Sequence, residues 1–284
     1  MRAMLKQLPT HAHRERYAAR LMTLAEAGLH DFIEGIENWR IWHLMGSAEL
    51  RRRYARSRLG QFWLTLSTGI LIGSLGLVWS VLWKMPVSEM MPYFAASMVI
   101  WTMLTGIIGD ATSVFSGSGR YFLNERMSFA TAIDALLYQH VLIFLHNAVI
   151  VVLVFAVFKH PVGLEALLAI PGFCLAVFTG MWVSYVVAIL CTRYRDLGQV
   201  VTSLLQIAFF VTPVLWKVEF VPEQYRSYIA LNPFAIYLSI IRDPLLGQPV
   251  PLEHWAIAAA ITVGGFLLSL PFIGRYHRRI VYWL

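Results

Sequence analysis

Apolar and polar positions follow one another along this chain in long blocks. Six apolar runs cover residues 64–83, 93–115, 137–158, 166–191, 200–216 and 255–274. A helix needs about 20 predominantly apolar residues to cross a bilayer, with a range of about 17–25. Five of the runs are long enough, and the run at 200–216 lies at the short end of that range. The pattern predicts an all-α polytopic membrane protein with six transmembrane helices in residues 63–284.

The stretch before the first run, residues 1–62, is predicted to form a cytoplasmic tail followed by an amphipathic interface helix. In "ENWRIWHLMGSAELRRRYARSRLGQFW" a stripe with helical spacing consists of Trp39, Trp42, Gly46, Leu50 and Tyr54, and arginines crowd its C-terminal end. Such a helix lies in the membrane interface beside anionic headgroups. Anchoring is the simpler explanation of the arginines. The alternative is that they meet the anionic head of a substrate at the cytoplasmic mouth, through Arg51, Arg52, Arg53, Tyr54, Arg56 and Arg58.

The longest loop, residues 217–254, contains the apolar stretch "LNPFAIYLSIIRDPLL" at 231–246. This stretch is too short to cross a bilayer. Pro222, Pro233 and Pro244 divide the loop, because proline interrupts a helix. We expect short helices at Glu223–Ala230 and Pro233–Arg242, the second acting as a re-entrant periplasmic gate. A helix resting on the membrane surface is the alternative.

The distribution of lysine and arginine predicts the orientation in the membrane. Eighteen of the 23 lie in residues 1–63, in the loops on that same side and in the C-terminal segment. The other side holds Lys84, Lys159, Lys217, Arg226 and Arg242. Cytoplasmic loops carry the excess of positive residues, so both termini are predicted to be cytoplasmic. The net charge of +7 then reflects topology and contact with membrane lipids, and we expect no nucleic-acid partner.

Composition supports the same class of protein. The chain is 58% hydrophobic and only 14% charged, whereas a soluble domain is about 25% charged. The first 37 residues contain no apolar signal-peptide core. Cys174 and Cys191 both fall in apolar runs, so we expect neither a disulfide framework nor a zinc site.

The motifs of several common enzymes are missing. The sequence contains no G-x-x-x-x-G-K-[ST] phosphate loop and no H-E-x-x-H zinc motif. His140 and His146 are six residues apart, which places them on different faces of a helix, so interhelical hydrogen bonding explains them better than metal binding. Asp110 is a single carboxylate near the inner end of the second run. We therefore expect no catalytic site, no metal and no cofactor in this chain, and interpret it as a conduit that another protein powers.

The first run carries small residues on one helical face: Gly69, Gly73, Gly76 and Ser80. Small residues allow a second helix to approach closely. That helix belongs either to the same chain or to another subunit, and the sequence leaves both possibilities open.

Several motifs, in order, resemble those of one transporter family. "RRRYARSRLGQFW" resembles the segment that enters the first span in the permease subunits of ABC exporters for polysaccharide, O-antigen or teichoic acid. "TRYRDL" at 192–197 resembles the loop after the fourth span of that family. "TPVLW" at 212–216, Pro222, "LNPF" at 231–234, and Arg242 with Leu245 resemble its signature around the fifth span. The resemblance extends from about residue 38 to the C-terminus.

The resemblance implies a function and a set of partners. Two copies of the chain would form a homodimer with two copies of an ATP-binding subunit, which holds the ATP and magnesium. The assembly would move a polysaccharide linked to undecaprenyl pyrophosphate across the bacterial inner membrane. A coupling helix at about 121–133 would transmit the closure of the ATPase, and its contact residues would be Tyr121, Asn124, Glu125, Arg126 and Phe129.

A glycan path favours aromatic side chains, because sugar C–H faces pack on aromatic rings. The candidates are the aromatic residues inside the predicted spans, together with residues of the predicted gate. They are Trp101, Phe144, Trp182, Tyr185, Trp216, Pro233, Phe234, Tyr237 and Arg242.

Two other functions remain open from the sequence. One is a stand-alone membrane glycosyl- or acyltransferase that uses Asp110, His140 and His146. The other is an exporter of drugs or small lipids from the same superfamily.

Overall fold

The computed structural model describes residues 11–54, 62–119, 122 and 127–284. Five helices within this part of the chain are long and apolar enough to cross a membrane. They are α3 (Phe62–Leu82), α4 (Val87–Ala111), α7 (Phe129–Val157), α8 (Ala169–Arg193, preceded by the short helix η2, Leu164–Leu168) and α12 (Leu252–Ile280). Together they indicate a multi-pass membrane protein, as the apolar runs predict.

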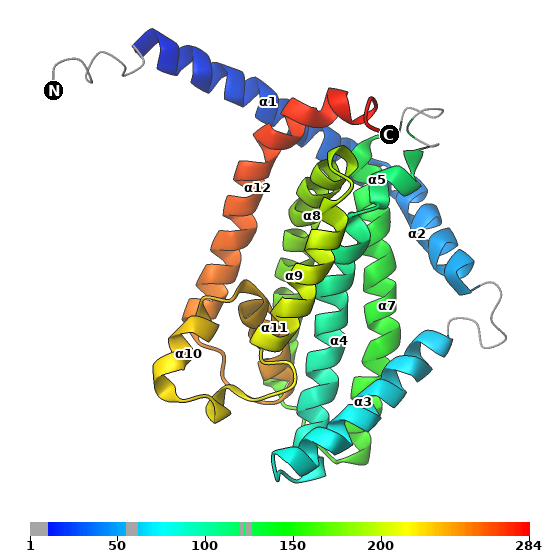
Figure 1. Ribbon diagram of the computed structural model, residues 1–284, viewed down its shortest axis with the longest axis vertical. Helices are drawn as coiled ribbons and strands as arrows, with labels where there is room; N and C mark the ends of the chain where they lie inside the picture. The colour runs from blue at the N-terminus through cyan, green and yellow to red at the C-terminus, as the bar shows by residue number, and fades with distance from the viewer. Residues whose placement is uncertain (1–10, 55–61, 120–121, 123–126) are drawn as a thin grey trace.

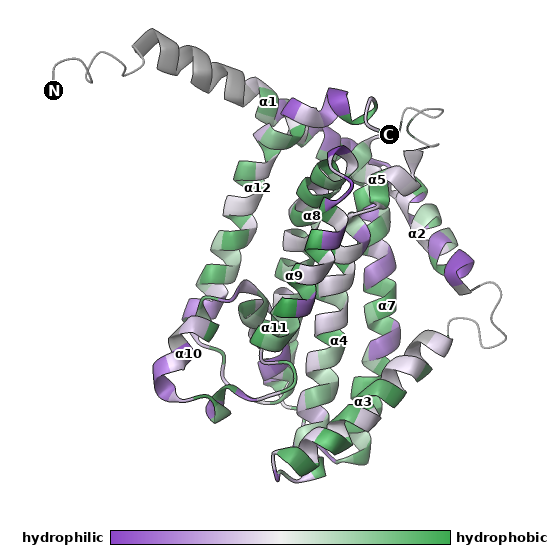
Figure 2. Ribbon diagram, in the orientation of Figure 1, coloured by the Kyte–Doolittle hydropathy of each residue, from purple (hydrophilic) through white to green (hydrophobic). Residues whose placement is uncertain are grey.

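The sixth predicted span corresponds to α9 (Leu197–Val211), which has only 15 residues. The prediction placed this run at 200–216 and was wrong about its end, because Pro213 removes a backbone donor and disfavours helix in the residue before it. A sixth complete crossing therefore stays a prediction. Figure 2 shows mostly hydrophobic ribbon along α8, α9 and α12, with hydrophilic residues gathered in α2, α10 and the end of the bundle that carries α1.

Helix α4 forms the centre of the bundle, and α3 lies at its edge (Figure 1). Of the span in α4, 78% is buried, against 17% in α3. Helix α4 packs against α3, α7, α8 and α11, so residues from most of the chain meet along it.

Two of the small residues of α3 face other helices of the same chain, whereas a Cβ added at Gly73 would meet nothing within 4 Å. A Cβ added at Gly76 would lie 2.5 Å from Sδ of Met91 on α4, and Gly69 faces Ile150 on α7. Close approach of helices is what small residues permit. The structure thus favours intrachain packing over a subunit interface for this face.

The predicted loop helices are present as α10 (Glu223–Ala230) and α11 (Pro233–Leu245), which follow the short helix η3 (Val218–Phe220). The Asn232 side chain accepts a hydrogen bond from the Phe234 amide, and Pro233 occupies the first turn, where its missing donor costs nothing. Helix α11 extends through Pro244 and packs against α4, α8 and α12. It therefore lies within the bundle, while opening and closing as a gate stays a prediction.

Two helices form the described part of the N-terminal region. Helix α1 (His11–Glu37) crosses one end of the bundle and packs along α12 and α7 (Figure 1). Helix α2 (Trp39–Tyr54) places Leu50 and Gly46 against α7 and leaves Trp39 exposed. The stripe predicted to face the membrane thus partly faces α7, and the interfacial position of α2 stays a prediction. The C-terminal end of α12 lies at the same end of the bundle as α1.

Candidate functional site

A groove lies between α2, α7 and the end of α4, where the short helix α5 (Val114–Gly117) follows. It encloses about 300 Å³. Its wall includes Arg52 and Arg53 from α2, Asp110 from α4 and Gln139 from α7. Gln139 is only 4% exposed, and its Nε2 has no hydrogen-bond partner among the described residues. An unpaired buried donor is costly, so this amide is available to a ligand with oxygen acceptors.

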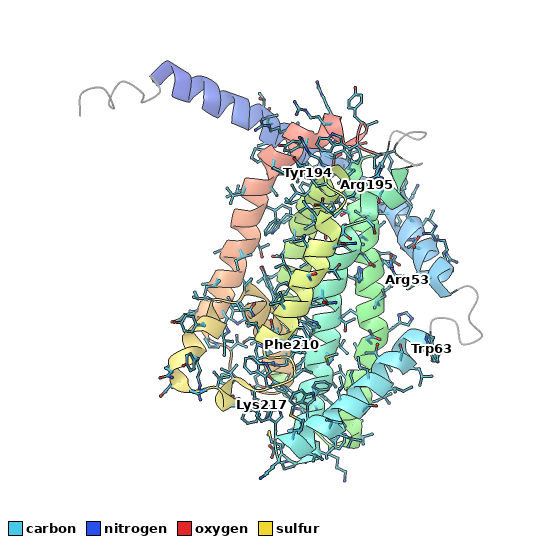
Figure 3. The ribbon with its side chains drawn as sticks, viewed as in Figure 1. Arg53, Trp63, Tyr194, Arg195, Phe210 and Lys217 are labelled. Carbon is cyan, nitrogen blue, oxygen red and sulfur yellow. The ribbon has the colours of Figure 1, made fainter. Side chains whose placement is uncertain are left out.

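One carboxylate organises the inner wall of this groove. Nη2 of Arg53 donates to Oδ2 of Asp110 over 2.9 Å, and Nε2 of His140 lies 3.1 Å from the same oxygen. Figure 3 shows Arg53 on α2 beside α7. The pairing corrects the view of Asp110 as a carboxylate without a partner. It also confirms interhelical hydrogen bonding for His140. His146 contacts the Leu142 carbonyl of its own helix, 2.8 Å away.

The other residues predicted to bind the head of a substrate are Arg51, Arg52, Tyr54, Arg56 and Arg58. Arg51 is exposed and donates from Nε to the Ser47 carbonyl, and Arg52 forms an ion pair with Glu49 over 2.7 Å. The side chain of Tyr54, and the whole of Arg56 and Arg58, lie outside the described residues.

Most of the predicted coupling residues also lie outside the described part of the chain. This holds for Tyr121, Asn124, Glu125 and Arg126. Phe129 is described: it begins α7 and is buried against Phe115 and Phe122. Its ring packs within the bundle, and the contact surface for an ATPase stays a prediction.

A second cavity of about 250 Å³ lies at the opposite end of the bundle. Its wall carries charged side chains of both signs, among them Lys217, Glu219, Arg226 and Asp243, and Figure 3 shows Lys217 at this end. Ile236 of α11 also lines this cavity and is 2% exposed. Ser239 joins two of the polar groups, because its hydroxyl donates to Asp243 over 2.6 Å and lies 3.0 Å from Nδ1 of His254.

Arg242 links the second cavity to α4. It is 5% exposed, and its Nε and Nη2 both donate to Oδ1 of Asp243 over 2.8 Å. Nη1 donates to the Pro213 carbonyl and to the Tyr93 hydroxyl, each over 2.8 Å. The guanidinium carbon also lies 4.3 Å from the centre of the Tyr93 ring, within cation–π range. Asp243, a backbone carbonyl and the Tyr93 hydroxyl thus accept the hydrogen bonds of the buried Arg242 guanidinium.

The predicted path residues from the middle of the bundle make intrachain contacts. Trp101 packs against Phe209 and Phe234, Phe144 packs against Phe173, and Trp182 lies over Gly265. The Tyr237 hydroxyl lies 2.6 Å from that of Thr179 and 3.1 Å from that of Thr262.

Three further path candidates differ in exposure. Tyr185 is fully buried and donates to Asp31, Pro233 is exposed, and the Trp216 indole donates to the Phe210 carbonyl over 3.2 Å. Whether any of these side chains face a substrate stays a prediction.

Sequence reasoning missed both Gln139 in the groove and a carboxylate on α1. Asp31 on α1 is 2% exposed and contacts residues of α7, α8 and α12. Asp31 lies in a segment with many charged residues, so the sequence gives no reason to distinguish it from a solvent-exposed carboxylate.

Comparison with known proteins gives one family. Residues 41–246, nearly three quarters of the chain, match the model for the ABC-2 type transporter. No curated protein matches the chain. The matched region begins in α2 and ends just after α11, so it leaves out α1 and α12. It includes all of the first cavity and most of the second, whose wall also contains Gln248, Pro249, Pro251 and His254.

Proposed function

Because the chain belongs to the ABC-2 type transporter family and is a transmembrane component of an ABC transporter, we propose that it exports a lipid-linked polysaccharide across the bacterial inner membrane. Two copies of the chain work with two copies of an ATP-binding subunit, which carries the ATP and magnesium. Both termini of the chain face the cytoplasm in this proposal. Undecaprenyl pyrophosphate is the lipid carrier.

The groove at α2 supports this class of substrate. It combines the guanidinium of Arg53 with the unpaired amide donor of Gln139. A guanidinium is the side chain best suited to bind phosphate oxygens, because its N–H groups match them in pairs. An arriving pyrophosphate would compete with Asp110 for Arg53, and Gln139 would donate to a second oxygen. The lipid tail would stay in the bilayer beside α3 and α7.

The first experiment examines a strain without the chain. We expect lipid-linked glycan to accumulate on the cytoplasmic face, and the wild-type chain to restore export. Affinity purification of the chain should recover an ATP-binding subunit, identified by mass spectrometry. A deletion strain with normal glycan export would contradict the polysaccharide proposal and favour an exporter of drugs or small lipids.

A matched pair of variants tests the groove itself. Arg53→Ala should raise the substrate concentration that gives half-maximal stimulation of ATP hydrolysis, because the variant lacks the guanidinium that binds the head of the carrier. Arg40→Ala is the control, since Arg40 is exposed and lies over the Trp39 ring. If the two variants needed the same substrate concentration for half-maximal stimulation of ATP hydrolysis, the groove would not bind the head of the carrier.

The enzyme alternative has less support. Asp110 and His140 are in contact, but Asp110 is also bound by Arg53, and His146 is directed to its own helix. These contacts leave no free base beside the carboxylate among the described residues.

A further inference from the structure

Helix α1 lies outside the region that matches the transporter family, yet it inserts a carboxylate into the bundle. Asp31 is 2% exposed and lies where α1, α7, α8 and α12 meet. Its Oδ1 accepts a hydrogen bond from Ser128 over 2.9 Å, and its Oδ2 accepts one from the Ala130 amide over 3.1 Å. The Tyr185 hydroxyl of α8 also donates to Oδ2, and Nδ1 of His277 on α12 is 3.5 Å from Oδ1.

These bonds make Asp31 the cap of a helix to which it does not belong. The first amides of a helix have no partner within it, and a carboxylate there also interacts favourably with the helix dipole. Ser128 occupies the N-cap position of α7 but makes no capping bond there. Its hydroxyl instead donates to Asp31. The start of α7 is therefore held by α1.

Glycines near Asp31 allow α1 to approach the neighbouring helices closely. A Cβ at Gly35 of α1 would lie 2.6 Å from Cβ of Ala130, and a Cβ at Gly274 of α12 would lie 1.9 Å from the Leu24 carbonyl. Glycine at these positions lets α1 rest directly on the backbones of α7 and α12. Phe32, next to Asp31, packs edge-on against Tyr185 and Phe266.

The contacts of Asp31 lie beside the segment that is predicted to couple the chain to the ATPase. Ser128, Phe129 and Ala130 lie within the segment, residues 121–133, that is predicted to receive the motion of the ATPase. Phe129 packs with Phe115 and Phe122 directly in front of the start of α7. Any displacement of this segment is passed to Ser128 and the Ala130 amide, and both are bonded to Asp31.

We propose that Asp31 is a positioning residue that clamps α1 to the start of α7, so that α1 and α12 move with the ATPase-coupling segment. The coupling part of this inference rests on the proposed function. The clamp itself rests only on the contacts of Asp31.

Hydrogen exchange tests the clamp on the purified full-length chain without nucleotide. Asp31→Asn should accelerate exchange at the Ala130 amide by about tenfold or more, because one neutral oxygen then replaces the two charged oxygens that bind Ser128 and Ala130. The control is Glu37→Gln, which neutralises an exposed carboxylate on the same helix. Equal exchange in the two variants would overturn the clamp.

A compensating pair separates clamping from capping. Asp31→Ala with Ser128→Asp supplies α7 with a carboxylate cap of its own but removes the carboxylate link between α1 and α7. We expect slow hydrogen exchange at the Ala130 amide to return. Coupling should stay poor, and it is measured as the ATP consumed per glycan exported by the complex in nanodiscs. The probe is undecaprenyl-pyrophosphate-linked glycan extracted from the deletion strain. Restored coupling in this double variant would mean that Asp31 only caps α7, and the proposal would be wrong.

The two proposals fail in different ways. A wild-type complex that exports no glycan with ATP would contradict the proposed function, and with it the coupling role of Asp31. The exchange measurement would still show whether Asp31 joins the helices. A wild-type complex that couples normally, beside an Asp31→Asn variant that couples equally well, would overturn the positioning role alone.

Discussion

Arg242 holds its positive charge at a position that is only 5% exposed. Asp243, Tyr93 and the Pro213 carbonyl accept hydrogen bonds from its guanidinium, and they come from three separate segments. A buried ion pair adds little net stability when compared with apolar residues, but breaking it by removing one partner is strongly destabilising. Arg242 therefore ties α11 to α4 and to the segment after α9.

Substitution of Arg242 should show this dependence. We expect Arg242→Met to lower the free energy of unfolding by about 3–5 kcal/mol, because the mostly buried Asp243 loses the guanidinium that pairs its charge and keeps only the Ser239 hydroxyl as a donor. Arg242→Met with Asp243→Leu should recover part of the loss, since both charges are then absent. Thermal unfolding in detergent measures each variant, with the exposed Arg195→Met as the control. A loss no greater than that of the control would show that Arg242 is not held as the structure indicates.

The partners of the buried or half-buried charged residues could not be predicted from the sequence. A charge within an apolar run is conspicuous, so Asp110, His140 and Arg242 could be selected as candidates. Their partners come from distant segments: Arg53 is 57 residues before Asp110, and Tyr93 is 149 residues before Arg242. Only the packing of the helices decides such pairs, and one sequence does not contain that information.

Among the helices, α11 gives the sharpest test at the level of an element. Ile236 is 2% exposed and lines the cavity beside α10, so a thiol at this position is shielded while the helix stays packed. In a background with Cys174→Ser and Cys191→Ser, Ile236→Cys should react slowly with a small water-soluble thiol reagent at rest. Reaction should become several-fold faster during ATP turnover, if α11 opens as a gate.

The control for α11 is Tyr228→Cys on α10, where the native side chain is 69% exposed. This thiol should react quickly with and without ATP. If Ile236→Cys behaved in the same way, α11 would not be a gate, although membership in the transporter family would be unaffected.

The segment before α7 supports a prediction about coupling. Reversing both charges at Glu125 and Arg126 should weaken ATPase binding or substrate-stimulated ATP hydrolysis, while the chain still inserts normally into the membrane. Both residues lie outside the described part of the chain, so the expectation rests on the family resemblance and on their position before Phe129. Unchanged transport in the double variant would move the coupling site, most plainly to "TRYRDL" at 192–197.

Hydropathy predicted most helices and missed those features that depend on packing. The third run is predicted at 137–158, but α7 begins at Phe129. Asp134 interrupts the apolar pattern before residue 137, yet it is buried within the bundle. Helix α12 extends to Ile280, beyond the predicted 274, with arginines in its last turn, where positive charge suits the helix dipole. Helix α1 was taken for a tail because its polar residues mask the few side chains that it buries.

Across the whole molecule, the two cavities lie at opposite ends of one bundle. One presents Arg53 and Gln139 beside α2 and α5, and the other presents Lys217, Arg242 and Asp243 beside α10 and α11. Transport from the first end to the second would require the packed side chains between them to separate. A second copy of the chain would supply the other wall of such a path.

The unpartnered face of α9 is where we expect that second copy. None of the side chains of α9 is buried, and Leu204, Ile207 and Phe210 are 58–70% exposed (Phe210 is labelled in Figure 3). In the background without native cysteines, Leu204→Cys or Ile207→Cys should form a disulfide between two copies in native membranes. Leu268→Cys on α12 is the control, because this residue is 79% exposed and is expected to face lipid. A disulfide requires Cα atoms within about 7 Å, so it forms only where the two copies meet closely. Cross-linking through Leu268→Cys alone would place the contact on α12 and leave α9 facing lipid.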